Sequence, residues 1–406
     1  MKYIEGGVCA AQGFKASGLH CGIRKNKTKR DVALIVSEKL GSAAAVYTTN
    51  LVKGAPILVD KQNLADGKAQ VIICNSGNAN TCNADGVQKA MEMCKIAGKQ
   101  CGVAPENVIV ASTGVIGMPL DITPIQNSIE ALYNELGNSL ESSKNAAEAI
   151  MTTDTAVKEV AVEFEIDGVT CKMGGIAKGS GMIHPNLATM LIFITCDADI
   201  SSEMIEKALQ ADVQKTFNMI SVDGDTSTND TVAIIANGMA GNNTIVSEGK
   251  AFDTFCEALY MLTSKLCKML AADGEGATKL LECVVTGGKT TEAARTVAKS
   301  VICSSLLKAA MFGADANWGR VLCAIGYSGA DVDIDKIDVA FKSEKGVLEV
   351  CKNGAGIPFS EEKAKEVLKE NEISILIDLN DGNNDATAWG CDLTYDYVKI
   401  NGDYRT

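Results

Sequence analysis

Hydrophobic and polar residues along this chain follow two periods, and each period predicts a different kind of element. Short apolar or β-branched runs, bounded by glycine and polar turns, predict strands. In the first part of the chain these runs are Asp31–Val36, Ala43–Thr49, Ala55–Val59, Gln70–Cys74 and Asn107–Ala111. We therefore expect the chain to begin with sheet.

Later in the chain the two periods alternate. Further strands are expected at Lys158–Glu165, Thr170–Met173, Met190–Thr195 and Val232–Ile235, and in a tail that begins at Tyr397. Apolar residues at helical spacing predict helices. The predicted helices are Gly86–Ala97, Ile122–Asn134, Lys144–Met151, Ser201–Phe217, Ala251–Ala272, Thr290–Cys303, Ser304–Gly313 and Ser360–Lys369.

The stretch Gly179–Thr195 joins a loop to a buried strand. Glycines permit unusual backbone angles in the loop, and Pro185 keeps His184 out of the helical region. The apolar run Met190–Thr195 then predicts the strand. Thr189 lies at the junction of the two halves.

A threonine in this position is most often only the start of a strand, and the alternative for Thr189 is a nucleophile. A cut of the Ala188–Thr189 bond would give Thr189 a free amine beside its own hydroxyl. Such an amine titrates near ~8, so it can act as a general base near neutral pH. Threonine activated by its own N-terminal amine is a known nucleophile arrangement.

Composition narrows the possible function classes. The 406 residues carry a formal net charge of −13, and 46% of them are hydrophobic, which is ordinary for a globular protein with two or three cores. The acidic balance argues against a basic groove for nucleic acid. The sequence also lacks an apolar run long enough to span a membrane and a secretory hydrophobic core. We therefore expect a cytoplasmic protein without nucleic-acid or membrane partners.

Cysteine and histidine usage points away from metal chemistry. The 15 cysteines are scattered without any Cys-x-x-Cys spacing, which fits reduced, buried thiols better than disulfides or a zinc site. The two histidines, His20 and His184, have no metal-ligand spacing around them. We expect no metal, and chemistry that does not need histidine.

Three loops beside predicted strands carry polar groups. In Ser112–Gly117, a glycine amide next to a threonine hydroxyl is suited to an oxyanion hole. The amides of Asn75–Asn80 could bind an anion, although a tight turn is the simpler interpretation. The acidic and amide groups of Asp223–Asp230 could bind Ca²⁺ or Mg²⁺, but hydrogen-bonded turns would use the same residues.

Three other segments have both a chemical and a purely structural interpretation. Glu275, between two glycines, is a candidate carboxylate for a substrate amine, or part of a solvated turn. The hydroxyl cluster Thr152–Thr155 follows a predicted helix, where capping and turn chemistry are common. The basic run Arg24–Arg30 could contact a phosphate, or form an exposed loop.

Eight motifs in the same order along the chain resemble the ornithine acetyltransferases, the ArgJ-type glutamate N-acetyltransferases of arginine biosynthesis. They are Asn75–Asn80, Ser112–Gly117, Met151–Thr155, Ala177–Gly179, His184–Leu191, Val222–Asp230, Asp273–Thr278 and Gly313–Arg320. The chain departs from that pattern at Ala10–Gln12, where the family usually has a proline, and at its end, Tyr404–Thr406.

The resemblance implies a fold and a maturation step. The fold would be α/β (α+β), a layered sandwich with stacked sheets between helices, similar to the N-terminal-nucleophile hydrolases. The precursor would cut itself between Ala188 and Thr189, giving an α chain of residues 1–188 and a β chain of residues 189–406. The two chains would stay together and form an α2β2 heterotetramer.

The resemblance also implies a site. Thr189 would be the nucleophile, and Thr113 with Gly114 would form the oxyanion hole. The implied substrate contacts are one of the pair Thr152 and Thr153 (with Thr152 preferred), Lys178, Thr189, Glu275, Asn401 and Thr406. No cofactor is implied; some members of the family also accept acetyl-CoA as acetyl donor, and the sequence leaves that donor open.

The leading hypothesis is a ping-pong transfer of acetyl from N-acetylornithine to glutamate through Thr189. One rival is a self-cleaving aminopeptidase or amidase, in which water resolves the acyl-enzyme; the ratio of hydrolysis to transfer separates the two. Another rival is a non-catalytic binding protein that uses the loops Asn75–Asn80 and Asp223–Asp230. That protein would have no reason to cut itself, so an intact mass after expression would favour it.

Overall fold

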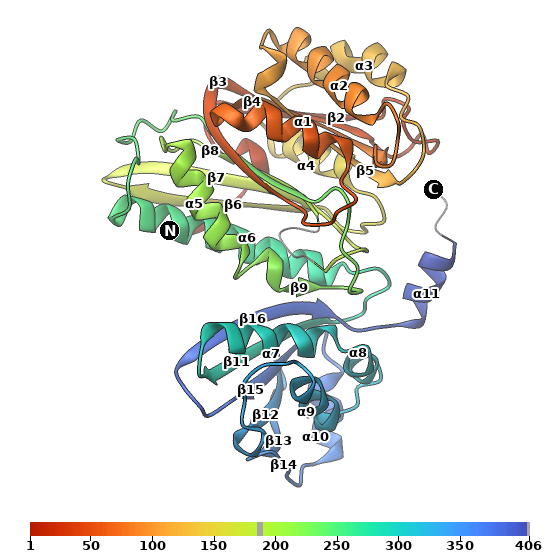
Figure 1. Ribbon diagram of the computed structural model, residues 1–406, viewed down its shortest axis with the longest axis vertical. Helices are drawn as coiled ribbons and strands as arrows, with labels where there is room; N and C mark the ends of the chain where they lie inside the picture. Colours follow the sequence, from red (N-terminus) through yellow and green to blue (C-terminus); the bar gives the residue numbers. More distant parts are fainter. Residues whose placement is uncertain (185–189, 404–406) are drawn as a thin grey trace.

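A computed structural model of the chain describes residues 1–184 and 190–403. Within this part, nine strands form a first mixed sheet (Figure 1). Its order is β1 (Lys2–Ile4), β6 (Lys158–Ile166), β7 (Val169–Lys178), β8 (Leu191–Cys196), β10 (Thr231–Ala236), β3 (Val32–Tyr47), β4 (Lys68–Asn78) and β5 (Val108–Val115), and β2 (Phe14–Leu19) pairs with β3.

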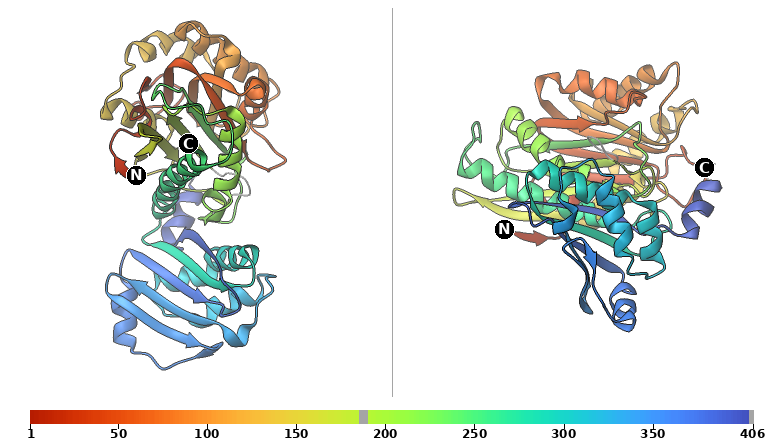
Figure 2. Two further views of the ribbon diagram at one scale, coloured as in Figure 1. Left: turned by 90° about the vertical axis from the view of Figure 1, so that its left-hand side faces the viewer. Right: turned by 60° about the horizontal axis from the view of Figure 1, so that its bottom comes forward.

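A second mixed sheet comes from the later part of the chain and forms the lower lobe in the left view of Figure 2. The described residues supply seven strands to it. Its order is β14 (Ala355–Gly356), β13 (Gly346–Lys352), β12 (Asp338–Ser343), β15 (Glu372–Asp378), β11 (Leu280–Gly288), β16 (Asn384–Cys391) and β9 (Ile220–Ser221).

Helices cover both sheets. They are α1 (Ala55–Asn63), α2 (Gly86–Cys101), α3 (Thr123–Asn134), α4 (Leu140–Ile150), α5 (Ser202–Val213), α6 (Lys250–Ala272), α7 (Thr291–Cys303), α8 (Ser305–Phe312), α9 (Trp318–Gly326), α10 (Glu361–Leu368) and α11 (Tyr395–Gly402). Figure 1 shows α6 between the sheets, where it packs against β6 and β7 and also contacts β11 and β16. The predicted α/β sandwich with stacked sheets and helical layers is confirmed.

Strand β8 lies at the centre of the first sheet. Every residue from Leu191 to Cys196 is buried, which explains the uninterrupted apolar run. β8 pairs antiparallel with β7 and parallel with β10, so that Leu191 lies opposite both Lys178 and Thr231. The end of β7 and the start of β10 therefore flank the first residue of β8.

Three sequence predictions about elements were wrong or incomplete. Ala55–Val59 is not a strand but the first part of α1; Pro56 lies in its first turn, where the missing N–H has no cost. The tail from Tyr397 is helical, in α11. The prediction also missed α9, whose start is capped by the Asn317 side chain, which accepts from Arg320 N.

The strands expected at Asp31–Val36 and Ala43–Thr49 belong to one long strand, β3. Its pairing with β4 shifts register between Val36 and Gly41. This irregularity explains why the alternation appeared as two runs in the sequence.

Several further features concern chemistry. All 15 cysteines lie within the described residues, and all are free thiols. Across residues 1–184 and 190–403, no helix combines the length and apolarity that a membrane span requires. The same residues contain no group of three or more His, Cys, Asp or Glu placed to hold a metal ion.

Candidate active site

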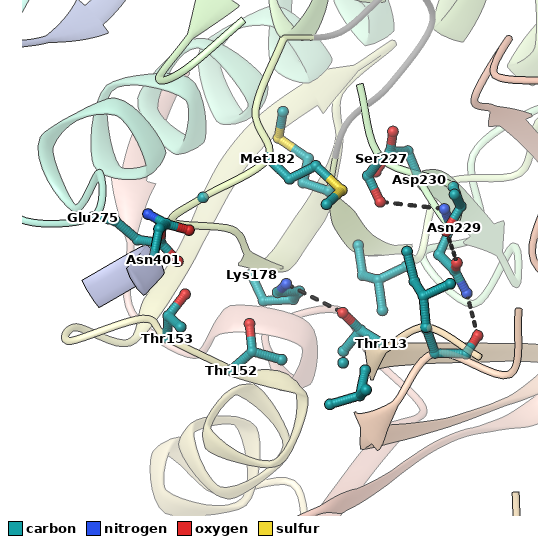
Figure 3. Close-up of a pocket in the computed structure, with 18 residues that line it drawn as sticks. Thr113, Thr152, Thr153, Lys178, Met182, Ser227, Asn229, Asp230, Glu275 and Asn401 are labelled. Carbon is teal, nitrogen blue, oxygen red and sulfur yellow. Dashed lines mark hydrogen bonds between the residues drawn. The ribbon is translucent and has the colours of Figure 1, made fainter. Parts of the chain in front are cut away.

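A cavity of about 240 Å³ beside the start of β8 collects the described residues of the predicted site (Figure 3). The lining includes Thr113, Gly114, Thr152, Thr153, Lys178, Glu275 and Asn401. The predicted nucleophile Thr189, its neighbour Ala188 and the terminal Thr406 lie outside the described residues. Met190 and Leu191, which follow Thr189 in the chain, line the same cavity.

Thr113 and Gly114 lie at the end of β5, beside the parallel end of β4. Gly114 pairs with Gly77, and its φ of +129° is a conformation that other residues rarely adopt. A Cβ at position 114 would come within 2.4 Å of the Gly77 carbonyl carbon. Only glycine fits here, so the backbone of this turn is held against its neighbour while it faces the cavity.

Lys178 ends β7 and donates from Nζ to Thr113 Oγ1 at 3.2 Å (Figure 3). Burial lowers the pKa of Lys178 from its ordinary value, and the carboxylates of Asp154 and Asp230 oppose that shift. The ammonium group is the cation that the cavity offers to a substrate carboxylate.

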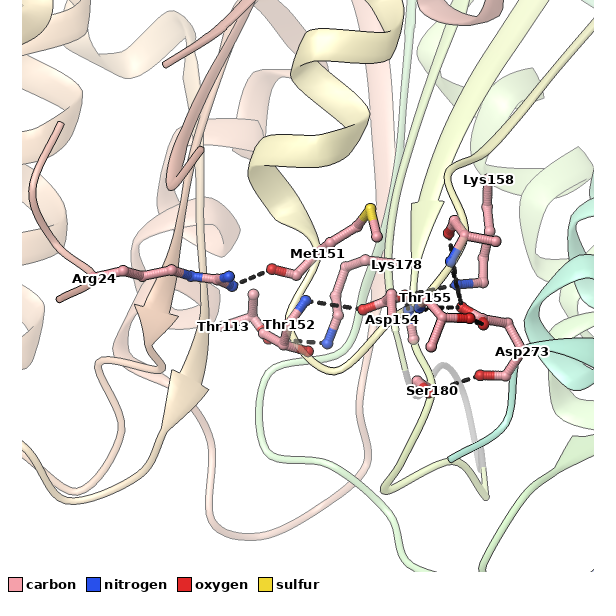
Figure 4. Close-up of polar contacts among 12 residues, drawn as sticks. Arg24, Thr113, Met151, Thr152, Asp154, Thr155, Lys158, Lys178, Ser180 and Asp273 are labelled. Carbon is pink, nitrogen blue, oxygen red and sulfur yellow. Dashed lines mark hydrogen bonds and ion pairs between the residues drawn. The ribbon is translucent and has the colours of Figure 1, made fainter. Parts of the chain in front are cut away.

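Thr152 and Thr153 follow α4 and face the cavity. Asp154 fixes this loop: its Oδ2 accepts from Thr152 N at 2.9 Å and its Oδ1 from Gly179 N at 2.7 Å (Figure 4). Burial works against the charged form, but Lys158 and Lys178 hold the pKa of Asp154 well below its usual range. In the sequence the cluster is distinctive only for its hydroxyl groups, and no signal there gave Asp154 a role.

Glu275 lies in the loop after α6 and is buried. Its Oε2 accepts from Asn401 Nδ2 at 2.7 Å, which joins α11 to the cavity. A Cβ on Gly181 would stand 2.4 Å from the Glu275 carboxyl carbon. The glycine before the predicted cut therefore leaves the room that this carboxylate occupies.

Asn229 links three segments around the cavity. Its Nδ2 donates to the carbonyls of Ala79 and Ser112 at 2.6 and 2.9 Å, and its Oδ1 accepts from Thr81 Oγ1 at 2.6 Å. The loop predicted as either a metal site or a set of turns thus uses Asn229 to hold the ends of β4 and β5. The acidic and amide composition of that loop was the available signal.

Asp223 and Asp230, at either end of that loop, have different surroundings. Asp223 accepts backbone N–H groups of Met182 and Ile183, at 2.6 and 3.0 Å, and so fixes the segment that follows Gly181. Asp230 lines the cavity, and its Oδ2 has no hydrogen-bond partner among the described residues. Burial raises the pKa of Asp230 well above its usual range, against the effects of Ser227 and Lys178.

His184 lies beside Ser221 and Cys303 and is absent from the cavity lining. Its Nδ1 is 3.1 Å from Ser221 Oγ and 3.4 Å from Cys303 Sγ. Burial lowers the pKa of His184 to about 4, and Lys299 acts in the same direction. His184 is thus neutral near pH 7.

The basic run Arg24–Arg30 is a loop between β2 and β3. Arg24 donates from Nη2 to Met151 O, one residue before Thr152, and Arg30 pairs with Glu148. The lysines between them, including Lys27, are exposed. The loop is therefore anchored by Arg30 to α4 and by Arg24 to the residue before the cavity residue Thr152.

The cavity offers the backbone of a strand end, a hydroxyl, the half-buried ammonium of Lys178 and a carboxylate within one enclosure. Such a set can bind an amino acid by its opposite charges and stabilise an oxyanion as an acyl group is transferred. All of these groups belong to described residues. Neither the binding of an amino acid nor the stabilisation of an oxyanion requires a histidine base.

Comparison with known proteins finds similarity over nearly the whole chain. The ArgJ family model matches residues 15–406. An arginine biosynthesis bifunctional protein ArgJ from Caldanaerobacter subterraneus subsp. tengcongensis is 50% identical over 407 residues, with 100% of each chain covered. A glutamate N-acetyltransferase from Methanocaldococcus jannaschii is 45% identical over 415 residues, again with 100% of each covered.

Among solved structures, an arginine biosynthesis bifunctional protein ArgJ from Bacillus halodurans is 46% identical, with a TM-score of 0.49. The match covers 52% of this chain and 98% of that chain.

Proposed function

The chain belongs to the ArgJ family, and from this premise we propose that its cavity transfers acetyl from N2-acetyl-L-ornithine to L-glutamate through an ester on Thr189. The protein is an acyltransferase of arginine biosynthesis, an ornithine acetyltransferase and glutamate N-acetyltransferase. The observation that supports the route is that the described residues of the predicted site line one cavity with Met190 and Leu191.

In the first half-reaction, Thr189 Oγ attacks the acetyl carbonyl of N-acetylornithine while the free α-amine of Thr189 accepts the hydroxyl proton. Negative charge then develops on the carbonyl oxygen, where Thr113 and the Gly114 turn stabilise it. Collapse of this intermediate breaks the amide bond, and the proton passes to the departing ornithine amine. Thr189 is left as an acetyl ester.

In the second half-reaction, the amine of glutamate attacks the ester carbonyl and the same groups stabilise the oxyanion. Lys178 binds the α-carboxylate that ornithine and glutamate share, with Thr152 beside it. Glu275, held by Asn401, attracts the side-chain ammonium of the ornithine part. The threonine hydroxyl is regenerated as N-acetylglutamate leaves.

Maturation uses the same hydroxyl in this proposal. Thr189 Oγ attacks the carbonyl of Ala188, the chain shifts onto an ester, and water releases an α chain of residues 1–188 and a β chain of residues 189–406. The two chains remain associated, and two such units form an α2β2 heterotetramer, whose mass gel filtration measures.

The Thr189 hydroxyl is tested by two substitutions. Thr189→Ala should give a folded, uncut and inactive precursor, because it removes the attacking group and costs only about 1–2 kcal/mol of stability. Thr189→Ser should still cut, but more slowly, since serine lacks the β-branch that restricts χ1. Intact mass and N-terminal sequencing report the cut, and clean processing of the alanine variant at the same bond would refute the scheme.

The acetyl ester is tested with the processed enzyme. Incubation with N-acetylornithine alone, followed by rapid quench, should add about 42 Da to the β chain, the mass of one acetyl group replacing a hydrogen. Saturating glutamate should discharge the adduct to N-acetylglutamate faster than water does. Predominant hydrolysis would indicate an amidase instead.

Acetyl-CoA as a second donor rests on the resemblance and on the position of the basic loop Arg24–Arg30 beside Met151. Steady-state assays with glutamate and acetyl-CoA, with and without Lys27→Glu and Lys29→Glu, test the donor and the loop together. An unchanged rate in the charge-reversed variant removes the loop from the donor site.

A further inference from the structure

A buried lysine that belongs to no predicted motif bridges Asp154, which follows the cavity residue Thr153, and Asp273, which lies two residues before Glu275 (Figure 4). Lys158, in β6, is 1% exposed. Its Nζ donates to Asp154 Oδ1 at 2.7 Å and to Asp273 Oδ2 at 2.5 Å. A single ammonium therefore bridges two carboxylates from distant parts of the sequence.

The Asp154 side of this bridge leads to the cationic end of the cavity. Asp154 also accepts from the backbone N–H groups of Thr152 and Gly179. Thr152 is itself one of the two proposed carboxylate-binding residues, and Gly179 directly follows the other one, Lys178. The position of Asp154 therefore sets the position of both groups.

The Asp273 side leads to the anionic end. Asp273 caps the C-terminus of α6 and accepts from the backbone N–H groups of Thr155 and Ala156. Its carbonyl accepts from Ser180 Oγ at 2.7 Å, and Ser180 O accepts from Glu275 N at 3.0 Å. Glu275 is thus fixed two residues beyond Asp273 by bonds that start at the Asp273 backbone carbonyl, while the Asp273 carboxylate holds that residue against Lys158.

The charge of Lys158 is needed at this place. A carboxylate at a helix C-terminus faces the negative end of the helix dipole, so Asp273 is unfavourable there without a cation. Asp154 is fully enclosed and also needs a neighbouring positive charge. Removal of one lysine would therefore leave two carboxylates poorly compensated and free to move apart.

We propose that Lys158 is a positioning residue that sets the spacing between Lys178 and Glu275 and thereby makes the cavity selective for the length of a diamino acid. This inference rests on the proposed function, in which Lys178 binds the α-carboxylate and Glu275 the side-chain ammonium of ornithine. Lys158 touches neither substrate charge. It fixes the two supports, through Asp154 on one side and Asp273 on the other.

After the proposed cut the bridge also spans two chains. Asp154 and Lys158 precede Ala188, whereas Asp273 and Glu275 follow Thr189. The spacing of the two binding groups then depends on a contact between the α and β chains. A peptide bond between residues 188 and 189 would not be needed to maintain it.

The test compares binding of L-ornithine with that of L-lysine, which is one methylene longer, by calorimetry on the processed enzyme. The double variant Lys158→Met/Asp273→Asn removes the bridge and leaves no unpaired charge at Asp273. Asp154 keeps the neighbouring cation Lys178 and its two backbone N–H donors, so the fold should be retained. Lys289→Met is the matched control, because it removes an ion-pairing lysine on the surface, where Lys289 contacts Asp331. Thermal unfolding is followed for each protein.

In the wild type, the Kd for lysine should exceed that for ornithine by about tenfold or more, since one methylene in a fitted site is commonly worth 10–200-fold. In the double variant this ratio should fall toward one while the melting temperature stays near that of the wild type. The control should keep the wild-type ratio. Lys158→Met alone should lose both the ratio and thermal stability.

An unchanged ratio in the double variant would overturn the inference and leave Lys158 with a purely structural role. This includes the case in which both ligands lose affinity by the same factor, because their ratio is then unchanged. Because the readout is equilibrium binding, it does not depend on turnover. Failure to form the acetyl ester on Thr189 would instead count against the proposed function, and the two failures are distinguishable.

Discussion

At the scale of single residues, the cavity depends on the absence of a side chain at Gly114 and at Gly181. A side chain at position 114 would collide with the backbone of Gly77, and one at position 181 with the carboxylate of Glu275. The first glycine lets two strand ends approach, and the second leaves space for a charged group. The sequence indicated Gly114 only for its amide, and Gly181 looks there like an ordinary loop glycine.

Asp212, in α5, allows a pH prediction at the same scale. Burial raises its pKa to about 6, against the lowering effects of Thr263, Thr216 and Lys215. Its Oδ1 has no hydrogen-bond partner among the described residues. The pKa of Asp212 is higher in the folded state than in the unfolded chain. Its contribution to the free energy of unfolding is therefore fully present below about pH 4, where the carboxyl group is protonated. It is lost as the pH rises through about 6.

We expect Asp212→Asn to be more stable than the wild type at pH 8, by the order of 2–3 kcal/mol for a shift of this size. At pH 4 it should have no advantage, because the wild-type carboxyl is then protonated in the folded state. Chemical denaturation at both pH values measures the difference. Glu257→Gln, on the exposed face of α6, is the control, and an equal gain at both pH values would contradict the assignment.

At the scale of elements, the site is built from the ends of strands and helices. β5 ends at Val115, directly after Thr113 and Gly114, β7 ends at Lys178 and α6 ends before Glu275. Strand and helix ends leave backbone groups unpaired and side chains free to face a cavity. Helix α11 differs from the other helices named here, because none of its residues is buried, yet it supplies Asn401.

Removal of the chain from Tyr395 onward tests this element. The truncated protein should keep its fold and nearly its full thermal stability, since no residue of α11 is buried. The Kd for ornithine should rise by about tenfold or more, because the truncation removes the Asn401–Glu275 hydrogen bond together with Thr406, the other contact that the resemblance implies in this segment. Circular dichroism melting and calorimetry measure the two quantities. Tyr395→Ala, at a residue 85% exposed, is the control and should bind normally. A collapse in melting temperature would show that α11 supports the fold.

At the scale of the whole molecule, the first sheet crosses the proposed cut. β8 and β10 come from residues after 189, whereas β7 and β3, which flank them, come from residues before 188. The later residues therefore occupy the middle of a sheet whose other strands belong to the earlier residues. Separation of the two pieces would break strand pairing on both sides of β8 and β10 and expose their apolar residues.

We expect the two pieces to co-elute in gel filtration and to separate only on a denaturing gel. Unfolding should be one cooperative transition, and refolding of the cut protein should depend on concentration, because two chains must recombine. The uncut Thr189→Ala protein, whose refolding needs no second chain, is the control. Elution of a free α or β piece under native conditions would contradict this picture.

Local signals gave the sequence prediction its successes. The buried run of β8, the amphipathic α6 and the glycines at strand ends are visible in the sequence as a hydrophobic period or a residue type. The fold was predicted from the resemblance to the family. Seven of the 18 described residues that line the cavity had been named as site residues from the sequence, among them Lys178 and Glu275. The strand assignment of Ala55–Val59 failed because five apolar residues fit a helix face as well as a strand.

The sequence by itself determined most of the elements and the groups that carry charge, because period, turn residues and ionisable side chains are local properties. Only the tertiary structure decided which of these groups meet. Lys158 gave no signal in the sequence, since its carboxylate partner Asp273 lies 115 residues away and at the end of another element. Burial makes this contact important. Where water is excluded, the carboxylates of Asp154 and Asp273 need the buried ammonium of Lys158 to compensate their charge.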